Sequence, residues 1–230
     1  MNPELLKLLR LSDLTLPVGG FSHSASLETY VQQGRVFDAV SAGLFIRQMI
    51  WQNFRYNEGY YFLKAWNAAT ASNWDAVRVT DRKCTAGKLA FEARQASLKM
   101  GHRLLQIFVK ELSADNGLKE YQAQVTAQRE WMGNYAVVFA VLAARMQIGA
   151  EPALQGWLYN SISGMVTNAV KLIPLGQQQG QELLALLIPE IGELVTAIAL
   201  VDEVSSGKSC AGFDLRSMQH ETLYTRLYMS

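Results

Sequence analysis

The sequence is poor in the residues that most often mark a chemical site. Its 230 residues include two cysteines and three histidines, and neither type is clustered. Cys84 and Cys210 form no C-x-x-C pair, so a structural zinc site is not expected, and a chain of this size needs no disulfide framework. Three scattered histidines build no local set of metal ligands. We therefore expect a reduced protein that binds no cofactor by itself.

Long apolar runs and an excess of one charge are also missing. The most apolar run, residues 135–144, ends at Arg145 and is far shorter than the roughly 20 residues that span a membrane. The first residues, MNPELLKLLR, turn polar too early for a signal peptide. The formal net charge is +1, with both signs interspersed, which disfavours a nucleic-acid binder. These absences favour a cytoplasmic protein with no nucleic-acid or membrane partner.

Helical periodicity is what the sequence has in abundance. Half of the residues are hydrophobic, enough for a substantial core. Apolar residues recur every three or four positions over 154–172 and 87–112, which predicts a helix in each range. Residues 134–149 are apolar on nearly every side and predict a central helix. Residues 38–71 are also compatible with helix, with an interruption at Gly59.

The rest of the chain fits the same class. Pro189 should divide the helical segment 178–204, and no alternating strand pattern or repeat is present. The sequence thus predicts one all-α domain over 1–230, a bundle of about nine or ten helices. Because several helices are apolar over wide faces, a homodimer is a natural extension.

The stretch LPVGGFSHSASLETY, residues 16–30, comes close to a serine-hydrolase signature. A nucleophile elbow needs G-x-S-x-G after a strand, but Ser24 replaces the second glycine and the preceding residues look helical. His23 cannot easily serve Ser22, since adjacent side chains diverge. The simpler interpretation is a glycine turn followed by a helix that Ser22 or Ser24 caps.

A nucleotide site is equally incomplete. Residues 205–209, SSGKS, resemble the end of a phosphate-binding loop, but Asp202 stands where the motif needs its first glycine, and no strand precedes it. A flexible loop between the last two helices explains the run better. We expect no nucleotide hydrolysis and no other enzyme activity from this chain alone.

Two further stretches have unusual composition. In KLIPLGQQQGQ, residues 171–181, Pro174 and Gly176 end one helix and glutamines lead into the next, which fits either a plain loop or a partner-contact loop. The tail HETLYTRLYMS, residues 220–230, stays apolar and aromatic almost to its end. Chain ends usually fray unless they are docked, so this tail is expected to dock on its own core or on a partner.

Together these stretches resemble a known family. LPVGGFSHSASLE, FEARQASLKMGHRLL, KLIPLGQQQGQ and HETLYTRLYMS are similar, in order and spacing, to motifs of the urease accessory protein UreF family. One departure is visible: the family often has His-Tyr-Pro where this chain has Asn134, Tyr135 and Ala136. That change removes an imidazole that could touch metal, and it removes a proline that could kink the central helix.

The resemblance implies an all-α protein that is not an enzyme. Proteins similar to this one dimerise and bind UreD, also called UreH, and together they recruit the GTPase UreG. The assembly delivers nickel to apo-urease, and UreF-like proteins are thought to regulate the GTPase. An adaptor for another GTPase or helical partner, unrelated to urease, is the alternative, and a small hydrolase that uses Ser22 is the last.

The motifs also suggest residue roles. We expect the tail to pack on the first motif, with the Arg226 guanidinium bonded to the Tyr30 hydroxyl or to nearby carbonyls, and to form the UreD-like interface. Lys171 and the loop 174–181 are assigned to the face that meets the GTPase, and Glu28 either joins that face or is a helix-surface carboxylate. The residues predicted to bind partners are Glu28, Tyr30, Lys171, Pro174, Gly176, Gln177, Gln181, Tyr224, Arg226, Leu227 and Tyr228. His23 and His220 are either exposed surface residues or nickel contacts within the assembly.

Overall fold

The computed structural model describes residues 3–229, apart from the Phe21 side chain, and over that range the chain folds into helices with no strand. Residues 1, 2 and 230 of the predicted domain and tail lie outside the described residues. The described part holds twelve α-helices, more than the nine or ten that the sequence predicts, because short helices are hard to tell apart by periodicity alone. The helices are α1 (Pro3–Leu11), α2 (Leu27–Gln32), α3 (Ala39–Gln48), α4 (Glu58–Thr70), α5 (Trp74–Ala86), α6 (Phe91–Phe108), α7 (Asn116–Ala127), α8 (Tyr135–Arg145), α9 (Ala150–Leu172), α10 (Gln177–Leu187), α11 (Glu190–Ala199) and α12 (Ala211–His220).

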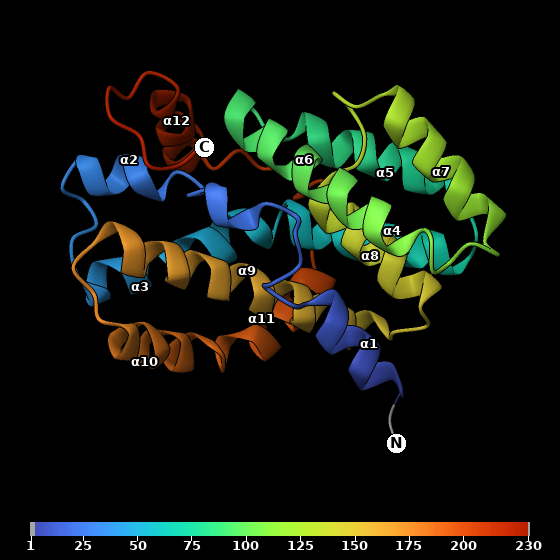
Figure 1. Cartoon of the computed structure of the whole chain (residues 1–230), viewed down its shortest axis with the longest axis horizontal. Helices are drawn as coiled ribbons and strands as arrows, with labels where there is room; N and C mark the ends of the chain where they lie inside the picture. The colour runs from blue at the N-terminus through green and yellow to red at the C-terminus, as the bar shows by residue number, and fades with distance from the viewer. Residues whose placement is uncertain (1–2, 230) are drawn as a thin grey trace.

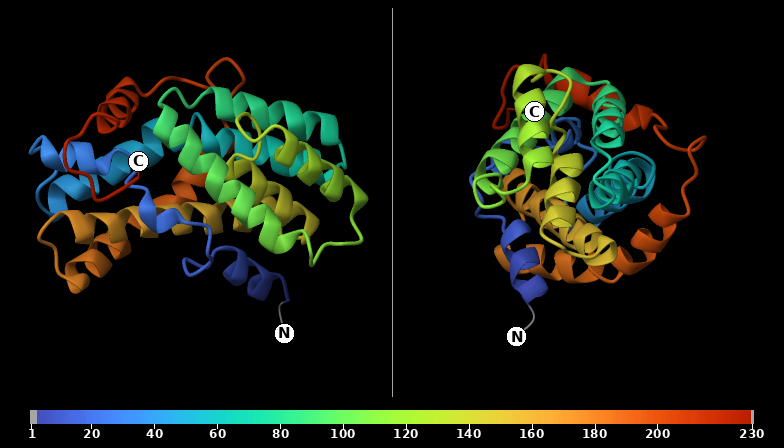
Figure 2. Two further views of the ribbon diagram at one scale, coloured as in Figure 1. Left: turned by 45° about the horizontal axis from the view of Figure 1, so that its top comes forward. Right: turned by 90° about the vertical axis from the view of Figure 1, so that its right-hand side faces the viewer.

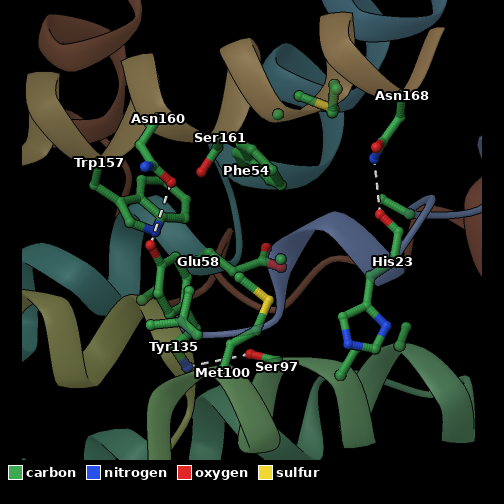
Figure 3. A pocket seen from close by; sticks show the side chains of 18 of the residues that line it. His23, Phe54, Glu58, Ser97, Met100, Tyr135, Trp157, Asn160, Ser161 and Asn168 are labelled. Atoms are coloured by element: carbon green, nitrogen blue, oxygen red, sulfur yellow. Dashed lines mark hydrogen bonds between the residues drawn. The ribbon is translucent and has the colours of Figure 1, made fainter. Parts of the chain in front are cut away.

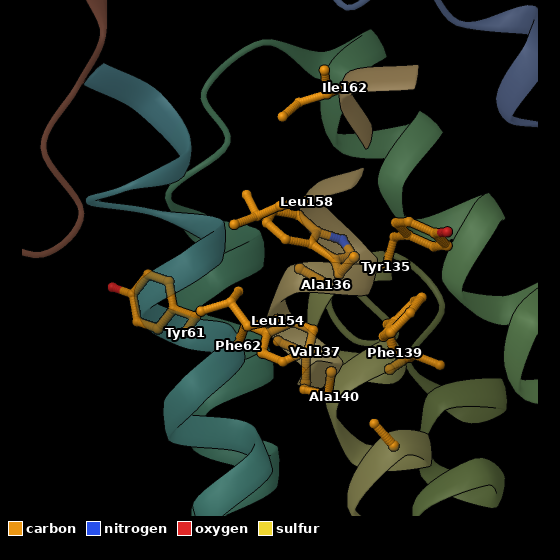
Figure 4. Close-up of a cluster of buried hydrophobic side chains, with 14 of the residues drawn as sticks. Tyr61, Phe62, Tyr135, Ala136, Val137, Phe139, Ala140, Leu154, Leu158 and Ile162 are labelled. Carbon is orange, nitrogen blue, oxygen red and sulfur yellow. The ribbon is translucent and has the colours of Figure 1, made fainter. Parts of the chain in front are cut away.

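Helix α8 is the centre of the fold, as its all-round apolar sequence predicts. Every residue from 135 to 143 is buried. The helix packs between α4 and α6, and the end-on view of Figure 2 shows it enclosed by its neighbours. Phe62 of α4 lies 5.9 Å from Phe139 of α8 and 5.8 Å from Trp157 of α9, ring centre to ring centre, and Figure 4 shows this cluster. Burying one such ring contributes roughly 1.5–3 kcal/mol.

The buried Asp81 of α5 fixes the loop that starts α8. Its carboxylate accepts the Tyr121 hydroxyl at 2.7 Å and the backbone N–H groups of Gly133 and Asn134 at 2.7 and 2.9 Å. Burial raises the pKa of Asp81 to about 6, although these three donors lower it. Asn134 in turn caps α8 by accepting the N–H of Ala136. The helix therefore begins at Tyr135, and no earlier turn is present for a proline to kink.

The predicted break within residues 38–71 is real but lies upstream of Gly59. A π-helical segment, Met49–Phe54, follows α3, and α4 begins only at Glu58. Gly59 belongs to the first turn of α4, where a Cβ would lie 2.6 Å from Ile198 of α11. The glycine thus allows two helices to approach closely and does not end a helix.

The second half of the chain matches its predicted boundaries closely. Helix α9 ends at Leu172, ahead of Pro174, and the segment around Pro189 divides into α10 and α11. Figure 1 shows α2, α3, α10, α12 and the last turns of α9 gathered at one end of the molecule, on the left. None of the helices within residues 3–229 is long and apolar enough to cross a membrane.

Candidate functional site

The first motif, residues 16–30, forms a turn and not a catalytic elbow. Gly19 adopts a left-handed conformation with φ of 87°, and Gly20–Ser22 form one 3-10 turn. The Ser22 hydroxyl donates to the Gly19 carbonyl at 2.8 Å, so it stabilises the turn. The predicted serine cap is wrong: Ser26 precedes α2 with φ of 68°, and its side chain makes no capping bond. A strained left-handed serine, and not a capped helix start, therefore turns the chain into α2.

The C-terminal tail docks on this motif, as the sequence predicts. After α12 the chain returns along α2, and the N–H groups of Leu227 and Tyr228 donate to the two carboxylate oxygens of Glu28 at 2.7 and 3.1 Å. The Met229 N–H donates to the Ser22 carbonyl at 2.8 Å. The Gln32 side chain donates to the Thr225 carbonyl at 2.7 Å. The tail is therefore held by its backbone between Thr225 and Met229.

Glu28 is not the helix-surface carboxylate that its position in a short helix suggests. Only 2% of the residue is exposed, and its oxygens accept from the tail and from His220. A buried carboxylate needs such donors to offset its lost hydration. In the docked arrangement Glu28 therefore meets a partner only through the tail that covers it.

His220, at the end of α12, lies between two carboxylates. Its side chain is 1% exposed, so a surface histidine is the wrong interpretation. Its Nε2 lies 3.0 Å from a Glu28 oxygen, and its Nδ1 lies 2.6 Å from an oxygen of Glu92 on α6. The other Glu92 oxygen accepts from the Arg226 guanidinium at 2.7 Å. Glu28, Glu92, His220 and Arg226 form the tail cluster, which joins α2, α6, α12 and the tail.

The predicted bond between Arg226 and Tyr30 is wrong. Arg226 binds Glu92, because a carboxylate is a stronger acceptor for a guanidinium than a phenol is. The Tyr30 ring instead packs 5.0 Å from Phe45 and 5.9 Å from Phe213, with the Arg216 guanidinium over its face at 5.3 Å. Burial raises the pKa of Tyr30. Tyr30 therefore anchors α12 to α2 and α3.

The side chains of the docked tail differ sharply in exposure. Tyr228 points inward and is 7% exposed, whereas Leu227 and Met229 on either side are 79% and 58% exposed. Tyr224 is fully exposed. The tail thus presents three apolar or aromatic side chains outward while its backbone is bonded to the core.

The predicted contact loop lies close to the tail. Lys171, Pro174, Gly176, Gln177 and Gln181 are all exposed around the turn from α9 to α10. A surface depression of about 240 Å³ separates this turn from the tail, and it is lined by Leu172 of α9 together with Val31, Gln32, Glu28, Thr225, Arg226 and Leu227. The structure therefore brings the last two sequence motifs to one end of the molecule.

His23 lies apart from the tail cluster and lines a partly open cavity of about 200 Å³ (Figure 3). The walls are mainly apolar, and Trp157, Phe54 and Met100 contribute to them. Burial first, and then the charge of Lys99, lowers the pKa of His23 to about 4, so the ring is neutral at neutral pH. A surface position is thus also wrong for His23, which is half-buried.

A metal site does not emerge from the residues that the structure describes. Over positions 3–229 no group of three or more histidine, cysteine, aspartate or glutamate side chains could hold a metal ion. Both ring nitrogens of His220 face carboxylates. Sequence reasoning missed Glu92, although FEARQ stood among the distinctive motifs, because nothing in the sequence pairs that residue with the tail.

Comparison with known proteins assigns the family. The UreF family model matches residues 36–188. The chain is 40% identical over 227 residues to the urease accessory protein UreF of Actinobacillus pleuropneumoniae, covering 99% of each. It is 41% identical over 230 residues to that of Haemophilus influenzae strain Rd, covering 99% of this chain and 96% of the relative. The Lachnoclostridium phytofermentans UreF is 32% identical over the full length of both chains.

These matches run through all four motifs, so they support the resemblance to the urease accessory family over the two alternatives. They also extend beyond residues 36–188 to the first motif and the tail, where the tail cluster lies. The protein is therefore a member of the UreF family of urease accessory proteins, which are not enzymes.

Proposed function

We propose that this protein bridges a UreD/UreH-like protein and the GTPase UreG, and regulates that GTPase while nickel is delivered to apo-urease. The observation that carries the proposal is the docked tail, whose backbone is bonded to Glu28 while Tyr224, Leu227 and Met229 face outward. Exposed apolar side chains on a fixed backbone are the anchors that protein interfaces use. We assign this surface to the UreD-like partner and place the assembly in the cytoplasm.

The turn from α9 to α10 is proposed as the surface for the GTPase. It faces the tail across the depression that Leu172 lines, so two partners bound at this end would also approach each other. Lys171 supplies a positive charge there, and Gln177 and Gln181 supply exposed amides. Nickel would be handled by the whole assembly, because the described residues of this chain hold no ready ligand set.

We also propose that the protein acts as a homodimer. An exposed apolar stripe runs along α3 and the residues just before it. Its members are spaced by three and four residues and are Phe37, 60% exposed, Val40, 71% exposed, and Leu44, 54% exposed. Such a stripe is what one helix presents to another. Light scattering on the purified chain should give twice the monomer mass, and the Val40→Glu variant should shift the protein toward monomer.

Co-purification with UreD and UreG homologues tests the bridging role. Leu227→Ala should weaken capture of the UreD-like protein, because it removes the outermost apolar anchor. Leu200→Ala is the matched control, since Leu200 is a leucine of nearly equal exposure, 78%, at the end of α11. If both variants capture the partner as the wild type does, the tail is not the interface.

A second pair of variants tests the GTPase surface. Lys171→Ala should reduce recruitment of UreG to the complex without loss of folding, and Lys119→Ala, an exposed lysine on α7, should leave it unchanged. The GTP hydrolysis rate of the captured UreG, compared with that of free UreG, reports regulation. Normal recruitment by Lys171→Ala would remove that residue from the surface.

A further inference from the structure

The tail cluster holds an imidazole in an unusual position, with an acceptor on each side. His220 Nε2 faces Glu28 at 3.0 Å and Nδ1 faces Glu92 at 2.6 Å, and the side chains of His220 and Glu28 are almost fully buried. A neutral imidazole carries one N–H donor and one lone pair, and both nitrogens become donors only in the charged ring. An ionised carboxylate only accepts. The docked geometry is therefore satisfied only when the cluster holds one proton more than a neutral ring between two carboxylates.

The neighbouring groups keep this requirement in place. The Arg226 guanidinium donates to the far oxygen of Glu92 at 2.7 Å, and a guanidinium offers donors only, so it supplies no acceptor for the proton of the cluster. Tyr228 lies beside Glu28, and burial together with the Glu28 charge raises the pKa of its phenol, so it stays neutral. The charged or titratable groups that face His220 are thus Glu28 from α2, Glu92 from α6, and Arg226 and Tyr228 from the tail.

Loss of the extra proton would act directly on the tail. It would leave a ring lone pair against a carboxylate oxygen in a site where an unpaired polar contact is expensive. Glu28 also holds the N–H groups of Leu227 and Tyr228, so any movement of its carboxylate breaks the two bonds that fix the tail backbone. Protonation and tail docking are therefore coupled through one side chain.

We propose that the tail cluster is a proton-dependent latch, which keeps the C-terminal tail docked while both His220 nitrogens are protonated and releases it as rising pH removes one proton. The sign follows from linkage: a docked state that retains a proton is favoured at low pH and weakens at high pH. Its biological meaning rests on the function proposed above, because the latch would control how the partner surface is presented.

Nuclear magnetic resonance on the full chain tests the latch without any partner. The backbone amides of residues 227–229 are followed from about pH 5.5 to about pH 8.5, around the range where a histidine titrates. We expect docked signals at low pH, and a docking equilibrium that falls by up to about tenfold per pH unit as pH rises. Tail signals that stay unchanged over the whole range would overturn the proposal.

Variants separate the proton from simple loss of contacts. Glu92→Gln should flatten the pH dependence, because a side-chain amide can donate to a neutral ring nitrogen. Arg226→Gln removes the guanidinium that contacts Glu92 but leaves the Glu92 carboxylate in place. This variant should retain the pH-dependent release of the tail. His102→Gln is the histidine control, since His102 binds the Met132 carbonyl away from the tail. A full transition in Glu92→Gln, or its loss in His102→Gln, contradicts the latch.

Partner binding is measured separately so that the two proposals can fail independently. Affinity for the UreD-like protein should fall as pH rises from about 5.5 to about 8.5 in the wild type and change less in Glu92→Gln. A tail transition with constant affinity would support the latch and refute the tail as the interface. A tail that stays docked throughout refutes the latch, whatever the partner does.

Discussion

Replacing Glu28 by glutamine should release the tail. The carboxylate accepts the Leu227 and Tyr228 N–H groups and faces His220, and a hydrogen bond to a charged group contributes about 1.5–3 kcal/mol. Glutamine keeps one acceptor oxygen but turns two N–H donors toward groups that also donate. The freed N–H groups of the tail form hydrogen bonds with water instead. We therefore count the free energy of one hydrogen bond to Glu28 and not the sum over all of them. Docking should therefore weaken about tenfold to about a hundredfold.

Hydrogen exchange on the tail measures this loss. Peptides that cover residues 221–229 should exchange faster in Glu28→Gln by the same factor, while peptides from the buried α8 keep their protection. Glu221→Gln is the matched control, because it makes the same chemical change at an exposed position of the tail. Unchanged tail protection in Glu28→Gln, or equal loss in the control, would refute the role assigned to this carboxylate.

Three other predictions address the core and the tail. Gly101→Ala would place a Cβ 2.0 Å from a backbone carbonyl and should lower stability to urea by at least about 1–3 kcal/mol, whereas Gly164→Ala meets no atom within 4 Å and should add about 0.5–1 kcal/mol. Burial raises the pKa of Asp81 to about 6, so the stability that Asp81 contributes should fall as pH rises from about 4 to about 6. The difference in unfolding free energy between the wild type and Asp81→Asn, measured in urea at each pH, reports this contribution. Arg226→Ala should speed tail exchange far less than Glu28→Gln, because its pair with Glu92 is partly exposed and contributes at most about 1 kcal/mol.

Much of the fold can be predicted from the sequence, because a helix that is buried on one face shows apolar residues every three or four positions. The central helix around Phe139, the long helix ending before Pro174 and the division at Pro189 all follow from apolar spacing and from proline geometry. The break near Gly59 is placed imperfectly. A glycine that ends a helix and a glycine that admits a neighbouring helix look the same in one dimension.

The site is harder to predict, for a physical reason. Tail docking follows from an apolar chain end, but the partner of Arg226 depends on which acceptor the fold brings within reach. Glu92 lies more than a hundred residues away from it in sequence, and no local pattern joins the two. Likewise Glu28 looks like a surface residue because its helix is short, and only the covering tail makes it buried.

The backbone bonds that fix the tail have a consequence for conformational entropy. Ordering one residue of a flexible chain costs about 1–2 kcal/mol at room temperature. In the docked tail, Leu227, Tyr228 and Met229 have already lost that freedom, because their N–H groups are bonded to Glu28 and to Ser22. A protein that binds Leu227 meets backbone that is already ordered, so less of the contact energy is spent on ordering the tail.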